Sequence, residues 1–120
     1  MAAGRYDITI EQGATFSLPI SYKDSTGSVL DLSSGYSAKM KIKESIGGTV
    51  IASTESEDDP KNTLTIALAA SGNNITIKMT AANTASLDFE NAVYDLELIS
   101  TTDTTRVIEG KVKLSKEVTV

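Results

Sequence analysis

The side chains that could do chemistry in this chain are few, because it contains no histidine and no cysteine. Histidine is the commonest general base and a frequent metal ligand, and cysteine supplies thiol chemistry. A serine or threonine nucleophile would therefore need a lysine as its base. The lysines alternate with apolar residues in strand-like runs, so we expect them to face solvent. The sequence predicts that the protein is not an enzyme and carries no cofactor.

One pair of carboxylates remains as a candidate. Asp95 and Glu97 lie two residues apart in "YDLEL", on one face of an expected strand. Two neighbouring carboxylates are the groups that a glycosidase uses. The simpler interpretation is that both face water and pair across the sheet with Lys111 or Lys113, and we favour it.

A second group of acids lies in the run "TESEDDPKN", which carries Glu55, Glu57, Asp58 and Asp59. Ca²⁺ is bound by six to eight oxygens from loops of this kind, but the spacing matches no EF-hand. We therefore interpret the run as a solvated loop. The alternative that stays open is a carbohydrate- or Ca²⁺-binding receptor-recognition module, although the absence of tryptophan removes the best aromatic platform for a sugar.

The elements that must position these groups are short strands, because apolar and polar residues alternate along most of the chain. Alternation and turn residues predict about seven to nine strands, spaced as in an antiparallel all-β fold. The stretch "TAANTASL" is the exception: Thr80 is a good N-cap, and this stretch predicts one short helical crossover between sheets. Periodicity does not separate a β-sandwich from a small barrel, and we favour the sandwich. The runs are "YDITI", "TFSLPISY", "YSAKMKIK", "TVIAS", "TLTIALA", "NITIKM", "AVYDLELIS" and "TRVIEGKVKLS".

The same alternation assigns a buried face to each strand. In "YSAKMKIK" the lysines Lys39, Lys41 and Lys43 fall on the solvent face. The residues expected inward in "YDITI" and "YSAKMKIK" are Tyr6, Ile8, Ile10, Tyr36, Ala38, Met40 and Ile42. In the late hairpin the expected core residues are Tyr94, Leu96, Leu98, Ile108, Val112 and Leu114.

Length and charge narrow the class of protein further. The chain has 120 residues, which predicts one domain spanning 1–120. A net charge of −5 argues against a nucleic-acid partner and against a basic membrane anchor. No segment approaches the roughly 20 apolar residues of a membrane span, and no signal peptide is recognisable at the start. We expect a protein made in the cytoplasm.

Two long segments carry a family resemblance. The first runs from "YDITIEQGATF" through "DSTGSVLDL" to "SAKMKIK", and the second from "ITIKMT" to the end. The shared features are "QG" followed by "F", the turn "DSTG" before "DL", the strand "YDLEL" and a "G-x-V" step at Gly110 and Val112. The pattern "T-x-A-x-T-A-x-L" is matched by Thr80, Ala82, Thr84, Ala85 and Leu87, and "VT" by Val118 and Thr119. With these features the chain resembles small structural proteins of tailed bacteriophages.

The resemblance implies an immunoglobulin-like β-sandwich in the virion, at a baseplate, tail-fibre attachment point, neck or capsid surface. It implies no catalytic residues. Other virion proteins would be its partners, in several copies of a symmetric assembly put together in the host cytoplasm.

For such a protein, function lies in contacts between chains, and five residues are the candidate contacts. Arg5 ends the segment 1–5, which carries no strand pattern and could become ordered on a partner. Pro19 cannot donate to a ladder and so indicates an edge strand. Val93, Ile99 and Val107 are apolar residues on faces expected to be wet, where they would form an exposed patch. The alternative is that the loop 54–62 covers this patch within the monomer.

Overall fold

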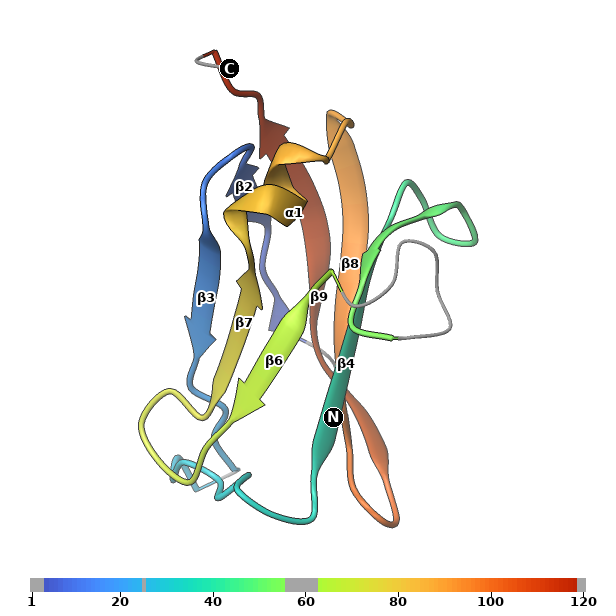
Figure 1. The fold of residues 1–120 in the computed structure, drawn as a ribbon. Coiled ribbons are helices and arrows are strands. Elements are labelled where there is room, and N and C mark those ends of the chain that lie inside the picture. The colour runs from blue at the N-terminus through green and yellow to red at the C-terminus, as the bar shows by residue number, and fades with distance from the viewer. Residues whose placement is uncertain (1–3, 25, 56–62, 119–120) are drawn as a thin grey trace.

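Two facing β-sheets make up the fold (Figure 1). The computed structural model describes residues 4–24, 26–55 and 63–118. The strands of the larger sheet are β1 (Gly4–Arg5), β2 (Ile8–Glu11), β4 (Ser37–Lys43), β5 (Val50–Ser53), β8 (Asn91–Ile99) and β9 (Thr104–Ser115). The strands of the smaller sheet are β3 (Phe16–Ile20), β6 (Thr65–Leu68) and β7 (Ile75–Met79). The large-sheet order is β1-β9-β8-β4-β5, with β2 also on β9, and the small-sheet order is β3-β7-β6.

This strand order is immunoglobulin-like. In chain order β3, β6 and β7 correspond to strands B, D and E, and β4, β5, β8 and β9 correspond to C, C′, F and G of a variable-type domain. The predicted all-β immunoglobulin-like sandwich is therefore confirmed. Among the described strands, β1 and β2 depart from the predicted antiparallel arrangement, because they run parallel to β9. The sequence did not predict this, since alternation along a strand carries no information about the direction of its neighbour.

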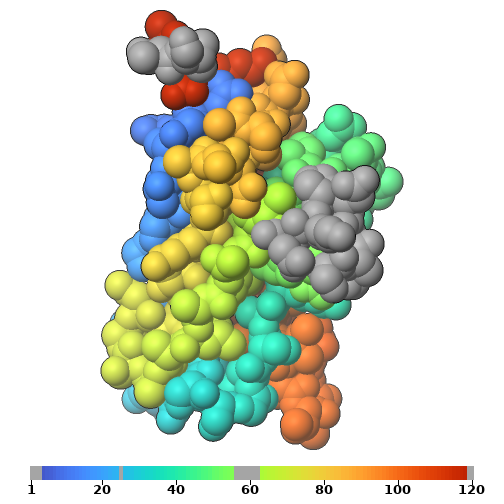
Figure 2. Space-filling model, in the orientation of Figure 1, coloured from blue at the N-terminus to red at the C-terminus, as the bar shows by residue number. Residues whose placement is uncertain are grey.

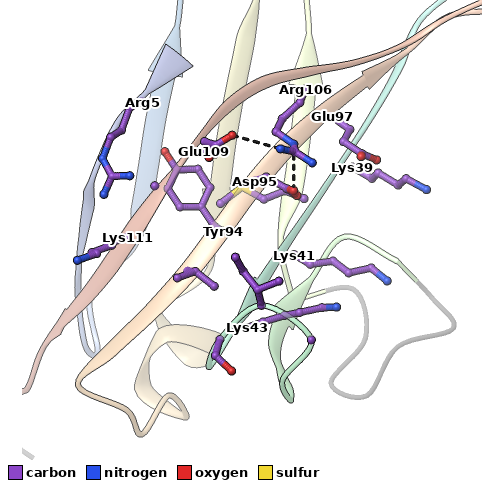
Figure 3. A pocket seen from close by; sticks show the side chains of 16 residues that line it. Arg5, Lys39, Lys41, Lys43, Tyr94, Asp95, Glu97, Arg106, Glu109 and Lys111 are labelled. Carbon is purple, nitrogen blue, oxygen red and sulfur yellow. Dashed lines mark hydrogen bonds and ion pairs between the residues drawn. The ribbon is translucent and has the colours of Figure 1, made fainter. Parts of the chain in front are cut away.

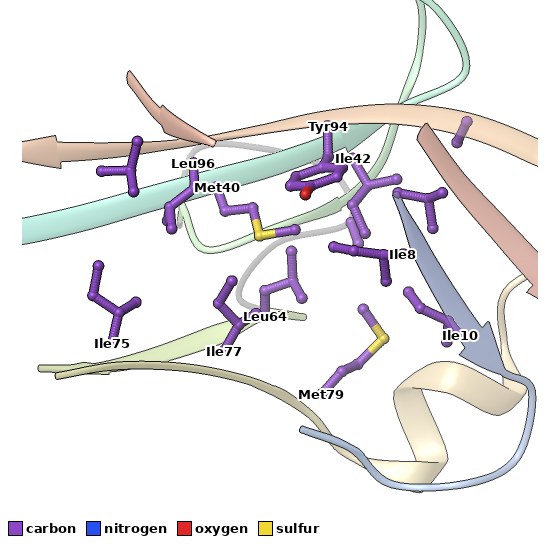
Figure 4. Packing of buried hydrophobic residues seen from close by; sticks show 14 of the residues in the cluster. Ile8, Ile10, Met40, Ile42, Leu64, Ile75, Ile77, Met79, Tyr94 and Leu96 are labelled. Carbon is purple, nitrogen blue, oxygen red and sulfur yellow. The ribbon is translucent and has the colours of Figure 1, made fainter. Parts of the chain in front are cut away.

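The core fills the space between the two sheets (Figure 4). Ile75, Ile77 and Met79 of β7 point toward the inner face of the larger sheet, and Leu64 lies between the layers. Of the expected late-hairpin core, Tyr94, Leu96, Leu98, Val112 and Leu114 are buried. Tyr36, also expected inward, is exposed, because β4 begins only at Ser37.

Tyr6 is the second aromatic residue that the alternation placed inward and that the structure leaves outside, with 51% of its surface exposed. The strand pauses between β1 and β2 at Tyr6, where the Tyr94 hydroxyl donates a hydrogen bond to the Tyr6 carbonyl. That carbonyl lies over Gly110, where any β-carbon would collide with it. The Asp7 carboxylate accepts from the Lys111 N–H at 2.9 Å. A close approach of backbone to backbone thus explains both the glycine and the break in alternation.

We expect the Tyr94 hydroxyl to give this contact a distinctive pH dependence. Burial, and then the charge of Asp7, raise the pKa of Tyr94 above its ordinary value of 10.0. A group whose pKa is raised by folding stabilises the fold at pH values below its pKa in the unfolded chain. This stabilisation is lost as the pH rises above that pKa. At neutral pH the free energy of unfolding of the wild type should exceed that of the Tyr94→Phe variant by about 1 kcal/mol. Urea unfolding of both proteins should show this difference shrink above about pH 10, and a difference independent of pH would contradict the assignment.

The predicted crossover helix is confirmed as α1 (Ala81–Ala85), which links β7 of the smaller sheet to β8 of the larger one. Thr80 is its N-cap, and its side chain accepts from the Asn83 N–H. Thr84 is fully buried; its hydroxyl accepts from the Gly13 N–H at 3.1 Å and donates to the Ala14 carbonyl at 2.8 Å. The helix is therefore fixed to the turn between β2 and β3 by a polar contact inside the protein.

Candidate functional site

The structure separates the five predicted contact residues into three locations. Arg5, Val93 and Ile99 belong to the larger sheet, where Val93 and Ile99 are half-buried in β8 and Arg5 is exposed in β1. Pro19 lies in β3, at the edge of the smaller sheet. Val107 is buried between the sheets. Of the candidates, Arg5 and Val93 line one groove.

Val107 is a wrong prediction, and a β-bulge is the reason. Leu96 pairs with Ile108 and Glu97 with Arg106, so Val107 is an extra residue in β9. A bulge of this kind shifts the alternation by one position. Val107 is consequently only 7% exposed, and Ile108, predicted as core, is half-buried beside it. Val107 cannot belong to an exposed apolar patch.

The N-terminal expectation also needs a correction. Residues 1–3 lie outside the described residues. Gly4 and Arg5 are already ordered within this chain, because they pair in parallel with Ile108 and Glu109 of β9. Arg5 also contacts Asp7 at 3.4 Å, with both side chains mostly exposed. Arg5 is therefore an ordered residue at the rim of the larger sheet.

Pro19 lies on an edge strand, as the sequence indicates. It is exposed and pairs with Thr76 of β7 on its one neighbouring strand. A proline has no N–H to offer to a strand that might be added at this edge. Proline on an edge is one of the devices by which sheets avoid unwanted pairing. We therefore interpret Pro19 as a residue that protects the edge of β3.

The outer face of the larger sheet forms a shallow groove of about 470 Å³ (Figure 3). Strands β4, β8 and β9 supply most of its lining, with Arg5 at one side and the β4–β5 turn at the other. Charged side chains from these strands cover the groove floor in Figure 3. The labelled ones are Lys39, Lys41, Lys43, Asp95, Glu97, Arg106, Glu109 and Lys111, and Arg5 of β1 is labelled beside them.

An ion-pair cluster occupies the middle of this groove. Arg106 lies 3.5 Å from the Asp95 carboxylate and 3.3 Å from that of Glu109 (Figure 3). Each of these side chains is about half exposed, so each pair contributes roughly 0–1 kcal/mol. The expected pairing of Asp95 and Glu97 with Lys111 or Lys113 is wrong. The register instead places Lys111 opposite Val93 and Lys113 opposite Asn91, and alternation alone does not define a register.

Most of the acidic run "TESEDDPKN" lies outside the residues that the structure describes. Glu57, Asp58 and Asp59 lie outside the described residues, as does most of the loop 54–62 proposed as an alternative cover for the patch. Within residues 4–24, 26–55 and 63–118 no group of three or more acids, histidines or cysteines could hold a metal ion. No helix in that part of the chain has the length and apolar character needed to cross a membrane.

Comparison with known proteins gives no information about the function of this chain. No family model matches the chain, and no curated protein matches it. A solved structure similar to it comes from a study of multimeric cell-adhesive interactions of VGSC beta subunits. That match is 12% identical, covers 99% of this chain and 98% of that chain, and has a TM-score of 0.46. At this similarity nothing about function carries over, and the immunoglobulin-like architecture is established by the strand order.

Proposed function

We propose that this chain is a non-enzymatic structural protein of a tailed-bacteriophage particle. It acts by protein–protein assembly in the tail or baseplate, at a fibre attachment point or at the neck. The observation that carries the proposal is the outer face of the larger sheet, a groove lined by both apolar and charged side chains. The resemblance of the sequence motifs to those of phage structural proteins is the reason for placing the chain in a phage particle.

The composition of this face suits a surface that meets other proteins. On the outer face of β8, Val93 and Ile99 flank Asp95 and Glu97, and all four are partly exposed. Interfaces between separately folded proteins are about as apolar as the rest of a protein surface and are surrounded by polar groups. A face of this kind can contact a partner and still keep the protein soluble before assembly. Several copies in a symmetric particle would multiply a modest affinity at each contact.

The proposal is tested on the particle itself. We expect purified phage particles from cells that express this protein to contain it, in several copies per particle, when they are analysed by quantitative mass spectrometry. An unrelated abundant cytoplasmic host protein, measured in the same preparation, controls for contamination. Absence from the particle, or a free monomer throughout infection, would overturn the proposal. Calorimetry showing micromolar Ca²⁺ or glycan binding by the isolated protein would instead favour a receptor-recognition module.

A further inference from the structure

One end of the groove has a charge pattern that differs from the rest. There the register places Lys43 of β4, Val93 of β8 and Lys111 of β9 in one row across the outer face. Neighbouring strands are about 4.8 Å apart, so the two backbone positions that carry the lysines are separated by roughly 10 Å. The half-buried Val93 lies between them. The row is therefore an apolar centre flanked by two cations.

Lys43, Val93 and Lys111 include no acid, whereas the neighbouring row through Asp95 does. Along the neighbouring row the register places Arg5, Glu109, Asp95 and Lys41 side by side, so that acids and bases alternate. Among the described residues, Lys43 and Lys111 form no ion pair. The carboxylate of Asp7 is already engaged, by Arg5 at 3.4 Å and by the Lys111 N–H at 2.9 Å. Neither lysine of this row is therefore paired with an acid in the described part of the chain.

Ile46 adds an apolar group beside this row. It lies in the turn between β4 and β5, lines the same groove as Lys43 and Val93, and is 95% exposed. An isoleucine so exposed contributes almost nothing to the core, and exposed apolar groups next to charged ones often mark contact sites. Sequence reasoning did not select Ile46, although an apolar residue directly before "GG" in a turn was the available signal.

We propose that Lys43, Ile46, Val93 and Lys111 form a docking site for a segment of a partner protein that carries carboxylates on either side of an apolar residue. The apolar side chain would lie on Val93 and Ile46, and the carboxylates would pair with Lys43 and Lys111. This rests on the proposed function, and it names the chemistry of the partner. Charge complementarity selects an acidic segment over a basic one. The apolar centre and the carboxylates of the next row select a peptide over a nucleic acid, whose phosphates they would repel.

The test uses two synthetic peptides and the intact protein. The probe is acetyl-Glu-Leu-Glu-Leu-Glu-amide, and the matched control peptide has lysine in place of each glutamate. Titration followed by ¹⁵N–¹H correlation spectra should shift the amide signals of Lys43, Ile46, Val93 and Lys111 with the acidic peptide only. Binding should weaken as salt is added. The double variant Lys43→Glu/Lys111→Glu should bind at least about tenfold more weakly, which corresponds to about 1.4 kcal/mol.

A second double variant controls for net charge. Lys23→Glu/Lys78→Glu makes the same change in charge at two exposed positions away from the larger sheet, and its binding should match the wild type. Dispersed spectra from both variants would show that each is folded. Equal binding of the two peptides, shifts on another face, or self-association of the protein through this row in place of peptide binding would overturn the inference. These outcomes are independent of particle composition, so a protein present in virions that ignores the acidic peptide would retain the proposed function and lose only the docking site.

Discussion

Leu96→Ala is expected to lower the free energy of unfolding by about 2–5 kcal/mol. Leu96 is fully buried in β8, between Met40 on one neighbouring strand and Ile108 on the other. Truncation would leave a cavity at the centre of the larger sheet, where the strands on both sides restrict relaxation. Equilibrium urea unfolding, followed by far-ultraviolet circular dichroism, measures the change.

Glu97→Ala is the matched control for this prediction. Glu97 is the next residue of β8, lies on the outer face of the sheet and is opposite Lys39 and Arg106. Its removal should cost less than about 1 kcal/mol, because the charges around it are exposed to solvent. If the two substitutions were equally costly, or if their order were reversed, β8 would be turned the other way, since a slip of one residue exchanges the two faces of a strand.

The sequence predicts the inner faces of the strands well, because burial on one side of a strand imposes a period of two. Ile75, Ile77 and Met79 of β7 are core residues, as the alternation indicates. The helix is predictable for a similar local reason: Thr80 can cap it without help from distant residues. Each of these elements depends mainly on its own sequence and on the presence of a core to face.

The predictions from sequence are wrong where contact with a second, distant segment determines whether a residue is buried. Val107 is buried because a bulge opposite Leu96 inserts one residue into β9, and the sequence of β9 itself does not predict this bulge. Tyr6 is outside because its own carbonyl turns toward the Tyr94 hydroxyl, a contact between residues 88 positions apart. The sequence predicted only Arg5 and Val93 of the groove as contact residues, for the same reason. Lys43, Val93 and Lys111 become neighbours only through the register of three strands.

Asn74 shows how far such a distant contact can matter. Its side chain is fully buried, and its amide oxygen accepts from the Tyr22 N–H at 2.7 Å. Its amide nitrogen donates to the carbonyls of Tyr22 and Leu30, both at 2.8 Å. The connection from β6 to β7 lies beside the segment that follows β3 (Figure 2). The Asn74 amide joins them by three hydrogen bonds, and the Leu32 N–H adds another to the Ala69 carbonyl at 3.0 Å. Asn74 thus supplies hydrogen bonds that a neighbouring strand would otherwise provide.

We expect Asn74→Ala to lower the free energy of unfolding, measured with urea, by about 3–5 kcal/mol, because it leaves the Tyr22 N–H and the Leu30 carbonyl without a partner, at about 1–3 kcal/mol for each group that stays dry. The Tyr22 carbonyl would keep only its hydrogen bond from the Leu30 N–H at 3.2 Å. Asn73→Ala, at the exposed neighbouring position, should cost less than about 1 kcal/mol. Asn74→Asp separates hydrogen bonding from packing, because aspartate has nearly the shape of asparagine but cannot donate when ionised. Its carboxylate would face the Tyr22 and Leu30 carbonyls, so this variant should be at least as unstable as Asn74→Ala at neutral pH. An Asn74→Asp protein as stable as the wild type would show that the two donated hydrogen bonds do not hold the segments together, because aspartate can still accept from the Tyr22 N–H.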